Sequence, residues 1–193
     1  MATGGVDGSG LPATVDAERF KDAFRRHAAG VAVVTAEVDG SPHALTASSV
    51  SSVSADPAVV LFSVATSTVT GAAVATAGSA AVHLLDADDL ALAVRCADPG
   101  ADRFSGEHPW SRLGTGEPVF DGPQLVLRGE VVGRMTFGTS VVIALAVTDL
   151  IDRRAAARDA ASDAPTDEED ARATPLAYVD RQWHTLGPAS TIG

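Results

Sequence analysis

The stretch that decides the fold is PHALTASSVSSVSADPAVVLFSV, residues 42–64. Two strand-like segments, 43–50 and 58–65, enclose a segment rich in small hydroxyl side chains. Seven hydroxyl residues lie between positions 46 and 63: Thr46, Ser48, Ser49, Ser51, Ser52, Ser54 and Ser63. Because strand side chains alternate between two faces, several of these hydroxyls share one face. A face of this kind does not cover a purely apolar core, and its small side chains let a flat ligand approach the backbone.

The neighbouring segments predict a mainly β protein. Residues 31–38, VAVVTAEV, form a predicted hairpin with 43–50 around a turn at 39–42. The apolar run 58–65 predicts a strand that is buried on both faces. Further strands are expected at 79–85, 125–137 and 140–151, with a closing hairpin at 176–186. We therefore expect an antiparallel barrel with helices packed outside it.

Three segments show helical signals. Residues 16–29 begin with Asp16 as N-cap, residues 67–77 begin at Ser67 or Thr68, and residues 86–97 begin with Asp86. The segment 102–123 is rich in Gly and Pro, which predicts a long surface excursion. The charged segment 152–175 reads equally as a helix or as a disordered insertion. These signals predict one domain over 16–187, with tails at 1–15 and 188–193.

Composition excludes several classes of function. The chain has 193 residues and a formal net charge of -11, which argues against a nucleic-acid or anionic-membrane partner. Its apolar runs are too short to cross a bilayer. The N-terminus lacks the basic and apolar regions of a signal peptide, so a cytoplasmic location is expected. A single cysteine, Cys96, allows no intrachain disulfide.

Metal and nucleotide-loop motifs are absent from the sequence. It contains no CxxC, HxH or HExxH and no Gly-Lys-Ser/Thr loop, so no metal site is predicted. Cys96 lies on a predicted helix and is interpreted as a buried core residue. Asp86 is interpreted as a helix cap, and Asp88 and Asp89 are interpreted as solvent-exposed residues.

A phosphate site is the most specific chemical prediction. The strand 58–65 runs into Thr66-Ser67-Thr68 immediately before a predicted helix. A helix N-terminus offers free N–H groups and a favourable dipole to an anion. Together with the hydroxyl-rich strand, this arrangement predicts a cavity for a planar ring that carries a phosphate. The alternative, that the hydroxyls only satisfy strand edges and cap the helix, stays open.

Four stretches follow one another in a characteristic order: FRRHAAGVAVVTAEVDGSPHALTASSVSSVSADPAVVLFSV from residue 24, DRFSG from 102, GEPVFDG from 116 and YVDRQWHTL from 178. Their order resembles the flavin reductase-like family, the FMN-binding split barrel found in reductase components of two-component monooxygenases. The resemblance covers roughly residues 17–186.

The resemblance implies an antiparallel split barrel of Greek-key type, a homodimer, and a flavin near the subunit interface. It implies an NAD(P)H-dependent oxidoreductase that binds FMN, with FAD as an alternative, and supplies reduced flavin to a separate oxygenase. Thr46, Ala47, Ser48 and Ser49 would line the ring and ribityl chain, and Arg103 and Phe104 would contact the flavin. The residues implied around the phosphate are Ser63, Val64, Ala65, Thr66, Ser67 and Thr68.

One departure from the family pattern concerns catalysis. Where family reductases commonly carry Gly-Asp-His, this sequence reads Gly138-Thr139-Ser140. No catalytic residue is therefore assigned, and His108 and Ser140 remain the candidates. Because the cofactor carries the hydride chemistry, loss of the histidine does not remove the reductase prediction. The alternatives are a flavin-binding carrier or sensor without nicotinamide chemistry, and an interaction module without flavin.

Overall fold

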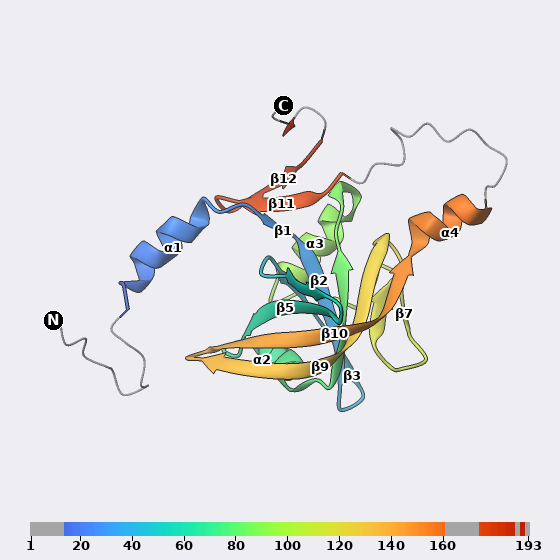
Figure 1. The fold of residues 1–193 in the computed structure, drawn as a ribbon, viewed down its shortest axis with the longest axis horizontal. Coiled ribbons are helices and arrows are strands. Elements are labelled where there is room, and N and C mark those ends of the chain that lie inside the picture. The colour runs from blue at the N-terminus through green and yellow to red at the C-terminus, as the bar shows by residue number, and fades with distance from the viewer. Residues whose placement is uncertain (1–13, 161–173, 188–189, 192–193) are drawn as a thin grey trace.

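The fold is built on one antiparallel sheet of seven strands, in the order β3-β2-β6-β9-β10-β5-β4 (Figure 1). The computed structural model describes residues 14–160, 174–187 and 190–191. The strands of this sheet are β2 (Ala32–Val38), β3 (Ser41–Ala47), β4 (Ser51–Ala55), β5 (Ala58–Ala65), β6 (Ser79–Leu84), β9 (Leu125–Phe137) and β10 (Ser140–Asp152). The sheet does not close, since β3 and β4 are its two edges. The predicted mainly β, antiparallel class is confirmed, and a split barrel is compatible with this sheet.

Two smaller sheets complete the β structure. A three-stranded sheet joins β1 (Ala29–Gly30) to the closing hairpin, β11 (Leu176–Val179) and β12 (Gln182–Thr185). A two-stranded sheet pairs β7 (Trp110–Arg112) with β8 (Pro118–Phe120). The second of these lies in the segment predicted to be a surface excursion.

The strand β2 separates two hydrophobic clusters. Ala32 and Val34 pack into the larger one with Phe62 of β5 and Ile143 of β10. Val33, on the other face, packs against α3 (Leu90–Ala97), β8 and β11 in the second cluster. A strand with both faces covered needs apolar residues at successive positions, which explains why β2 is buried from Ala32 to Ala36.

The strand β5 corrects one prediction. Val60, Phe62 and Val64 are buried in the larger cluster, whereas Val59 and Leu61 on the opposite face are only half-buried. The prediction of a strand buried on both faces was wrong, because only one face of β5 meets the core. The sequence of β5 is apolar at successive positions, so its pattern does not show which of the two faces is buried.

The segment 102–123 is also corrected. Its residues 117–120 are buried, and Phe120 packs in the second cluster. The Phe120 N–H donates to Nε2 of the buried His83 at 3.1 Å, while His83 Nδ1 lies 3.0 Å from the Val33 carbonyl oxygen. A buried pair of contacts of this kind fixes the segment to the sheet.

The described residues contain four α-helices: α1 (Ala17–Arg25), α2 (Val69–Thr76), α3 (Leu90–Ala97) and α4 (Arg153–Ala160). Asp16 caps α1 as predicted, since its Oδ1 accepts from the Glu18 and Arg19 N–H groups. A short 3-10 helix, η1 (Ala87–Asp89), precedes α3, and the Asp89 carboxylate accepts from the Asp86 N–H at 3.0 Å. Both α1 and α4 project away from the main sheet (Figure 1).

Two predictions fall partly outside the described residues. The helix α4 occupies the start of the charged segment 152–175, and residues 161–173 of that segment are not described. Most of the expected N-terminal tail, residues 1–13, also lies outside the residues that the structure describes. Within the described ranges, no helix is long and apolar enough to cross a membrane. The same residues contain no cluster of three or more acidic, histidine or cysteine side chains placed to hold a metal ion.

Candidate functional site

A cavity of about 480 Å³ lies where the strands β3 and β5 end and the helix α2 begins. Six of the residues implied for the flavin line it: Thr46, Ser63, Val64, Ala65, Thr68 and Arg103. The cavity therefore brings the hydroxyl-rich strand and the helix start together, as the sequence predicted for a ring with a phosphate.

The start of α2 is organised by Thr68. Its Oγ1 accepts from the Gly71 N–H at 3.0 Å and donates to the Ala65 carbonyl at 3.2 Å. A Cβ on Gly71 would lie 2.1 Å from that same carbonyl oxygen, so only glycine fits here. The first residues of α2, at the positive end of the helix dipole, therefore line the cavity.

Gly71 was missed by the sequence reasoning. The spacing Thr68-x-x-Gly71 is a signal that was available, because the N-cap side chain bonds to the third helical residue. It does not reveal the close approach of Ala65, which depends on the turn between β5 and α2. That approach becomes visible only in three dimensions.

Arg103 places a positive charge beside this turn. Its Nη1 donates to Thr70 Oγ1 at 2.9 Å and its Nη2 donates to the Asp98 carbonyl at 2.7 Å. The Nε of Arg103 is buried and has no hydrogen-bond partner among the described residues. An unpaired buried donor is costly, so this geometry favours an anionic acceptor at the start of α2.

Other implied residues are used by the fold. Thr46 lines the cavity and also donates to the Ala93 carbonyl at 2.6 Å, which joins β3 to α3. Ala47 is buried in the larger hydrophobic cluster. Phe104 stacks on Phe120 at 5.4 Å between ring centroids and does not line this cavity. Thr46, Ala47 and Phe104 therefore contribute to packing of the fold, and of the three only Thr46 lines this cavity.

The remaining hydroxyl residues lie close by but outside the cavity. Ser49 Oγ accepts from the Ser63 N–H at 2.9 Å, and both Ser48 and Ser49 line a second cavity. Thr66 Oγ1 donates to the Thr139 carbonyl at 3.1 Å, which holds the turn between β9 and β10. Ser67 is exposed in the turn that precedes α2.

The two catalytic candidates are not brought into this cavity. Ser140 is exposed at the start of β10, where it pairs with Ala65 in the sheet register. His108 is half-buried in the loop before β7 and lines neither cavity. Cys96 lies in the cavity wall, and burial raises its pKa to about 12, so it is a core thiol and not a nucleophile.

The chemistry of this site is binding. A guanidinium, a helix N-terminus and hydroxyl groups are the kinds of group that bind a phosphate, and the side chains at the end of β3 are small. No described acid or base lies in the cavity except Arg103 and the protonated thiol of Cys96. Such a site suits a reaction whose chemistry is carried by a bound cofactor.

Comparison with known proteins decides the family. Residues 24–187 match the model of the flavin reductase like domain. The chain belongs to this family. An NADH:FMN oxidoreductase from Rhodococcus erythropolis is 34% identical over 169 residues, covering 88% of this chain and 81% of that protein. An NADH:riboflavin 5'-phosphate oxidoreductase from Streptomyces pristinaespiralis is 40% identical over 125 residues, covering 64% of this chain and 70% of that protein.

Solved structures agree with this assignment. The flavin reductase domain protein from Arthrobacter sp. FB24 superposes with a TM-score of 0.74 at 30% identity, covering 89% of this chain and 96% of that chain. The family predicted from the order of motifs is therefore confirmed. The family-model match over residues 24–187 includes both the end of β5 and Arg103, the parts from which the cavity is built.

Proposed function

We propose that this flavin reductase is an NAD(P)H-dependent flavin oxidoreductase that binds FMN and supplies reduced flavin to a separate monooxygenase. The observation that carries the proposal is the anion cradle formed by Thr68, Gly71 and Arg103 at the start of α2. FAD is the alternative flavin, since it carries a phosphate at the same position of its ribityl chain. NADH or NADPH is the co-substrate.

The residues of this chain bind and orient. Arg103 and the first turn of α2 would hold the phosphate, and the Thr46–Ser49 stretch would lie along the ring. When bound, the flavin supplies the ring system that accepts a hydride from the reduced nicotinamide. Anchoring by the phosphate fixes where the ring lies, which leaves its exposed face to the nicotinamide. This division of labour requires no acid or base from the protein.

A second candidate function follows from the turn between β9 and β10. Gly138-Thr139-Ser140 occupies this turn, and the Thr139 carbonyl accepts from both the N–H and the Oγ1 of Thr66. The turn therefore lies next to the loop that precedes α2, and it carries no histidine. This observation favours a protein that holds a flavin without oxidising NAD(P)H.

Subunit association is part of the proposal. Phe20 on α1 and Met135 and Phe137 on β9 expose about half of their surface, at 52%, 52% and 50%. Large apolar side chains left exposed on projecting elements support association of two copies, with the flavin near their interface. Sedimentation equilibrium should return twice the mass of the chain, and a monomer at all concentrations would contradict this part.

Steady-state NADH and NADPH oxidation by the purified protein, with and without added FMN or FAD, tests the function. The proposal expects saturable oxidation that depends on added or bound flavin. Flavin binding without oxidation of either nicotinamide would establish the second candidate. Neither flavin binding nor oxidation would contradict both.

A further inference from the structure

The turn between β9 and β10 is fastened to the loop that enters α2. Its two loop residues are Gly138 and Thr139, between the paired residues Phe137 and Ser140. Of these two loop residues, only Gly138 has a positive φ, of 57°, which is the pattern of a type II′ hairpin turn with glycine in its first position. A two-residue turn of this kind has little conformational freedom, so it fixes the direction of the Thr139 carbonyl.

Thr66 directs both of its hydrogen-bond donors to that carbonyl. Its N–H donates to the Thr139 oxygen at 2.8 Å, and its Oγ1 donates to the same oxygen at 3.1 Å. A carbonyl oxygen has two lone pairs and can accept both bonds. The pairing of β5 with β10 ends one residue earlier, at Ala65 and Ser140, so the two bonds of Thr66 extend the contact from the strand into the loop.

The peptide group that Thr139 holds also shapes the start of α2. The Ala65 carbonyl and the Thr66 N–H belong to one planar unit and point in opposite directions, because the peptide bond between them is trans. The Ala65 carbonyl accepts from the Thr68 N–H at 3.4 Å and from Thr68 Oγ1 at 3.2 Å, and it lies against Gly71. One rigid plane is therefore bonded on one side to the β9–β10 turn and on the other side to the anion cradle.

Thr66 is not placed to contact a ligand in either cavity. It is half-buried and lines neither of them, whereas Ala65 and Thr68, which lie before and after it in the chain, both line the first cavity. An effect of the Thr66 side chain on flavin binding must therefore pass through the peptide plane that Thr66 shares with Ala65.

We propose that Thr66 is a positioning residue for the flavin phosphate: its hydroxyl sets the tilt of the Ala65–Thr66 peptide and thereby the position of the first turn of α2. The inference rests on the proposed function and deepens it. The N–H groups of a helix N-terminus bind an anion only where their directions fit it, so a small tilt of this turn weakens several bonds to the phosphate together.

Thr66→Val tests the role of the hydroxyl. The variant keeps the size, the β-branch and the N–H bond to Thr139, and it leaves no carbonyl unpaired. It should therefore fold, with a midpoint of thermal unfolding within about 4 °C of the wild type. We expect its Kd for FMN, measured by fluorescence titration of the full chain, to rise about fivefold.

Riboflavin separates positioning from general destabilisation. It has the ring and the ribityl chain of FMN but no phosphate, so its Kd should be the same for Thr66→Val and for the wild type. A purely structural role of Thr66 would weaken both flavins alike or neither of them. In turnover, Thr66→Val should raise the KM for FMN about fivefold while kcat and the KM for the nicotinamide stay unchanged.

Two matched variants complete the test. Thr66→Ser restores the hydroxyl and should return the Kd for FMN to within about twofold of the wild type. Thr76→Val makes the same chemical change at the other end of α2, where the Thr76 Oγ1 donates to the Ala73 carbonyl at 2.8 Å and lines neither cavity. It should bind FMN as the wild type does.

The assignment is overturned if Thr66→Val binds FMN as the wild type does, if it loses as much affinity for riboflavin as for FMN, or if Thr66→Ser does not restore the affinity. An equal loss in Thr76→Val would also overturn it, since any hydroxyl on α2 or its entry loop would then have the same effect. Failure of the proposed function has a different signature. In that case neither NADH nor NADPH is oxidised, while the loss of FMN affinity in Thr66→Val and its recovery in Thr66→Ser persist. A wild-type protein that binds no FMN would contradict both.

Discussion

Thr68 caps α2 and lines the cavity proposed to hold the flavin phosphate, and a substitution can separate these two roles. Asp and Asn cap a helix as well as Thr does, so both retain the bond to the Gly71 N–H. Asp would add a negative charge beside a phosphate bound in this cavity. We therefore predict that Thr68→Asp raises the Kd for FMN by at least about tenfold, measured by fluorescence titration.

Thr68→Asn is the matched control, since it has the same size and capping ability without the charge. It should bind FMN within about threefold of the wild type, and both variants should bind riboflavin, which has no phosphate, alike. If Thr68→Asp binds FMN as the wild type does, the phosphate does not lie at the start of α2.

Gly71 tests the close approach of the turn to the helix. Gly71→Ala would place a Cβ 2.1 Å from the Ala65 carbonyl oxygen, so the turn must move. We predict a loss of about 1–3 kcal/mol in the free energy of unfolding, together with weaker FMN binding. Gly78→Ala, which meets nothing within 4 Å, should change stability by less than about 0.5 kcal/mol. Chemical denaturation of both variants compares them directly, and equal stability would contradict the account.

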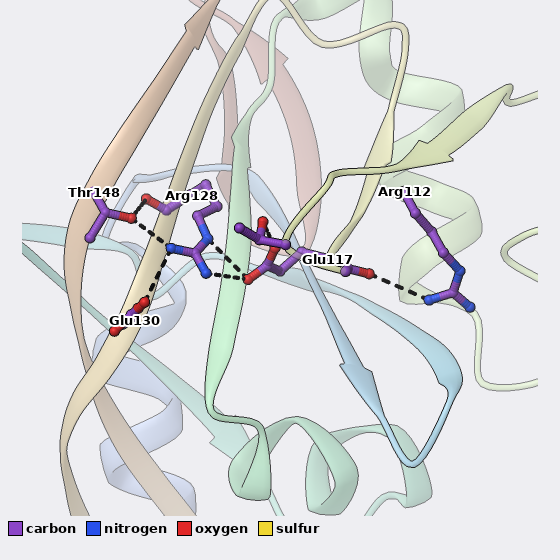
Figure 2. Close-up of polar contacts among 7 residues, drawn as sticks. Arg112, Glu117, Arg128, Glu130 and Thr148 are labelled. Carbon is purple, nitrogen blue, oxygen red and sulfur yellow. Dashed lines mark hydrogen bonds and ion pairs between the residues drawn. The ribbon is translucent and has the colours of Figure 1, made fainter.

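At the scale of elements, a buried ion pair ties the β7–β8 hairpin to the main sheet (Figure 2). Glu117, with a side chain 1% exposed, contacts Arg128 of β9 at 2.8 Å. Arg128 also donates to Thr148 of β10 at 2.8 Å and lies 3.5 Å from Glu130. The pair therefore connects the segment before β9 to two strands of the sheet.

Removing one partner of this pair should be costly. Glu117→Ala leaves the Arg128 guanidinium without its buried counter-ion, and we predict a loss of about 3 kcal/mol in the free energy of unfolding. Glu130→Ala removes a carboxylate that is 64% exposed from the same guanidinium and should cost less than about 1 kcal/mol. Urea denaturation of both variants provides the comparison. Similar losses in the free energy of unfolding for the two variants would show that burial of Glu117 does not make its ion pair with Arg128 the more stabilising one.

The sequence predicted elements whose signals are local. The strand β5 and the caps Asp16 and Thr68 follow from β-branched runs and capping residues within a few positions. The hairpin β7–β8 was missed, because its burial depends on Arg128 and on His83, which are distant in sequence. Long-range pairing of this kind leaves no periodic trace in a Gly- and Pro-rich segment.

The sequence predicted some of the cavity residues and missed others. Thr68 and Arg103 were named, whereas Gly71 and the basic second cavity were not. Lys21, Arg25 and Arg181 line the second cavity and come from opposite ends of the chain, so no motif joins them. Phe104 and Thr66 were placed at the flavin by resemblance, and the structure gives them contacts with Phe120 and Thr139.

At the scale of the whole molecule, acid should destabilise the fold in two stages. Burial lowers the pKa of His83 from 6.5 to about 4. Between these values the unfolded chain takes up a proton that folded His83 does not, so stability is full above pH 6.5 and falls by roughly 3 kcal/mol as the pH approaches 4. Free energies of unfolding across this interval test the first stage. His83→Gln should flatten the profile there, and an unchanged slope would contradict the assignment.

Glu117 governs the second stage. Burial raises its pKa, but hydrogen bonds from Arg128, Ser79 and Thr115 outweigh burial and lower it to about 2. The folded carboxylate thus stays charged below its ordinary value of 4.5, and stability continues to fall from 4.5 to about 2. Glu117→Gln should remove this second slope while leaving that of His83, which denaturation at each pH would show.

The central claim is that this chain holds a flavin and delivers a hydride to it from NAD(P)H. Anaerobic mixing of the FMN-loaded protein with NADH or NADPH measures this step directly, through the visible absorbance of oxidised flavin. We predict that the absorbance is lost in proportion to the nicotinamide added and that Thr68→Asp, under the same FMN concentration, shows little loss. Flavin that stays bound and oxidised in the presence of excess NADH and NADPH would contradict the claim.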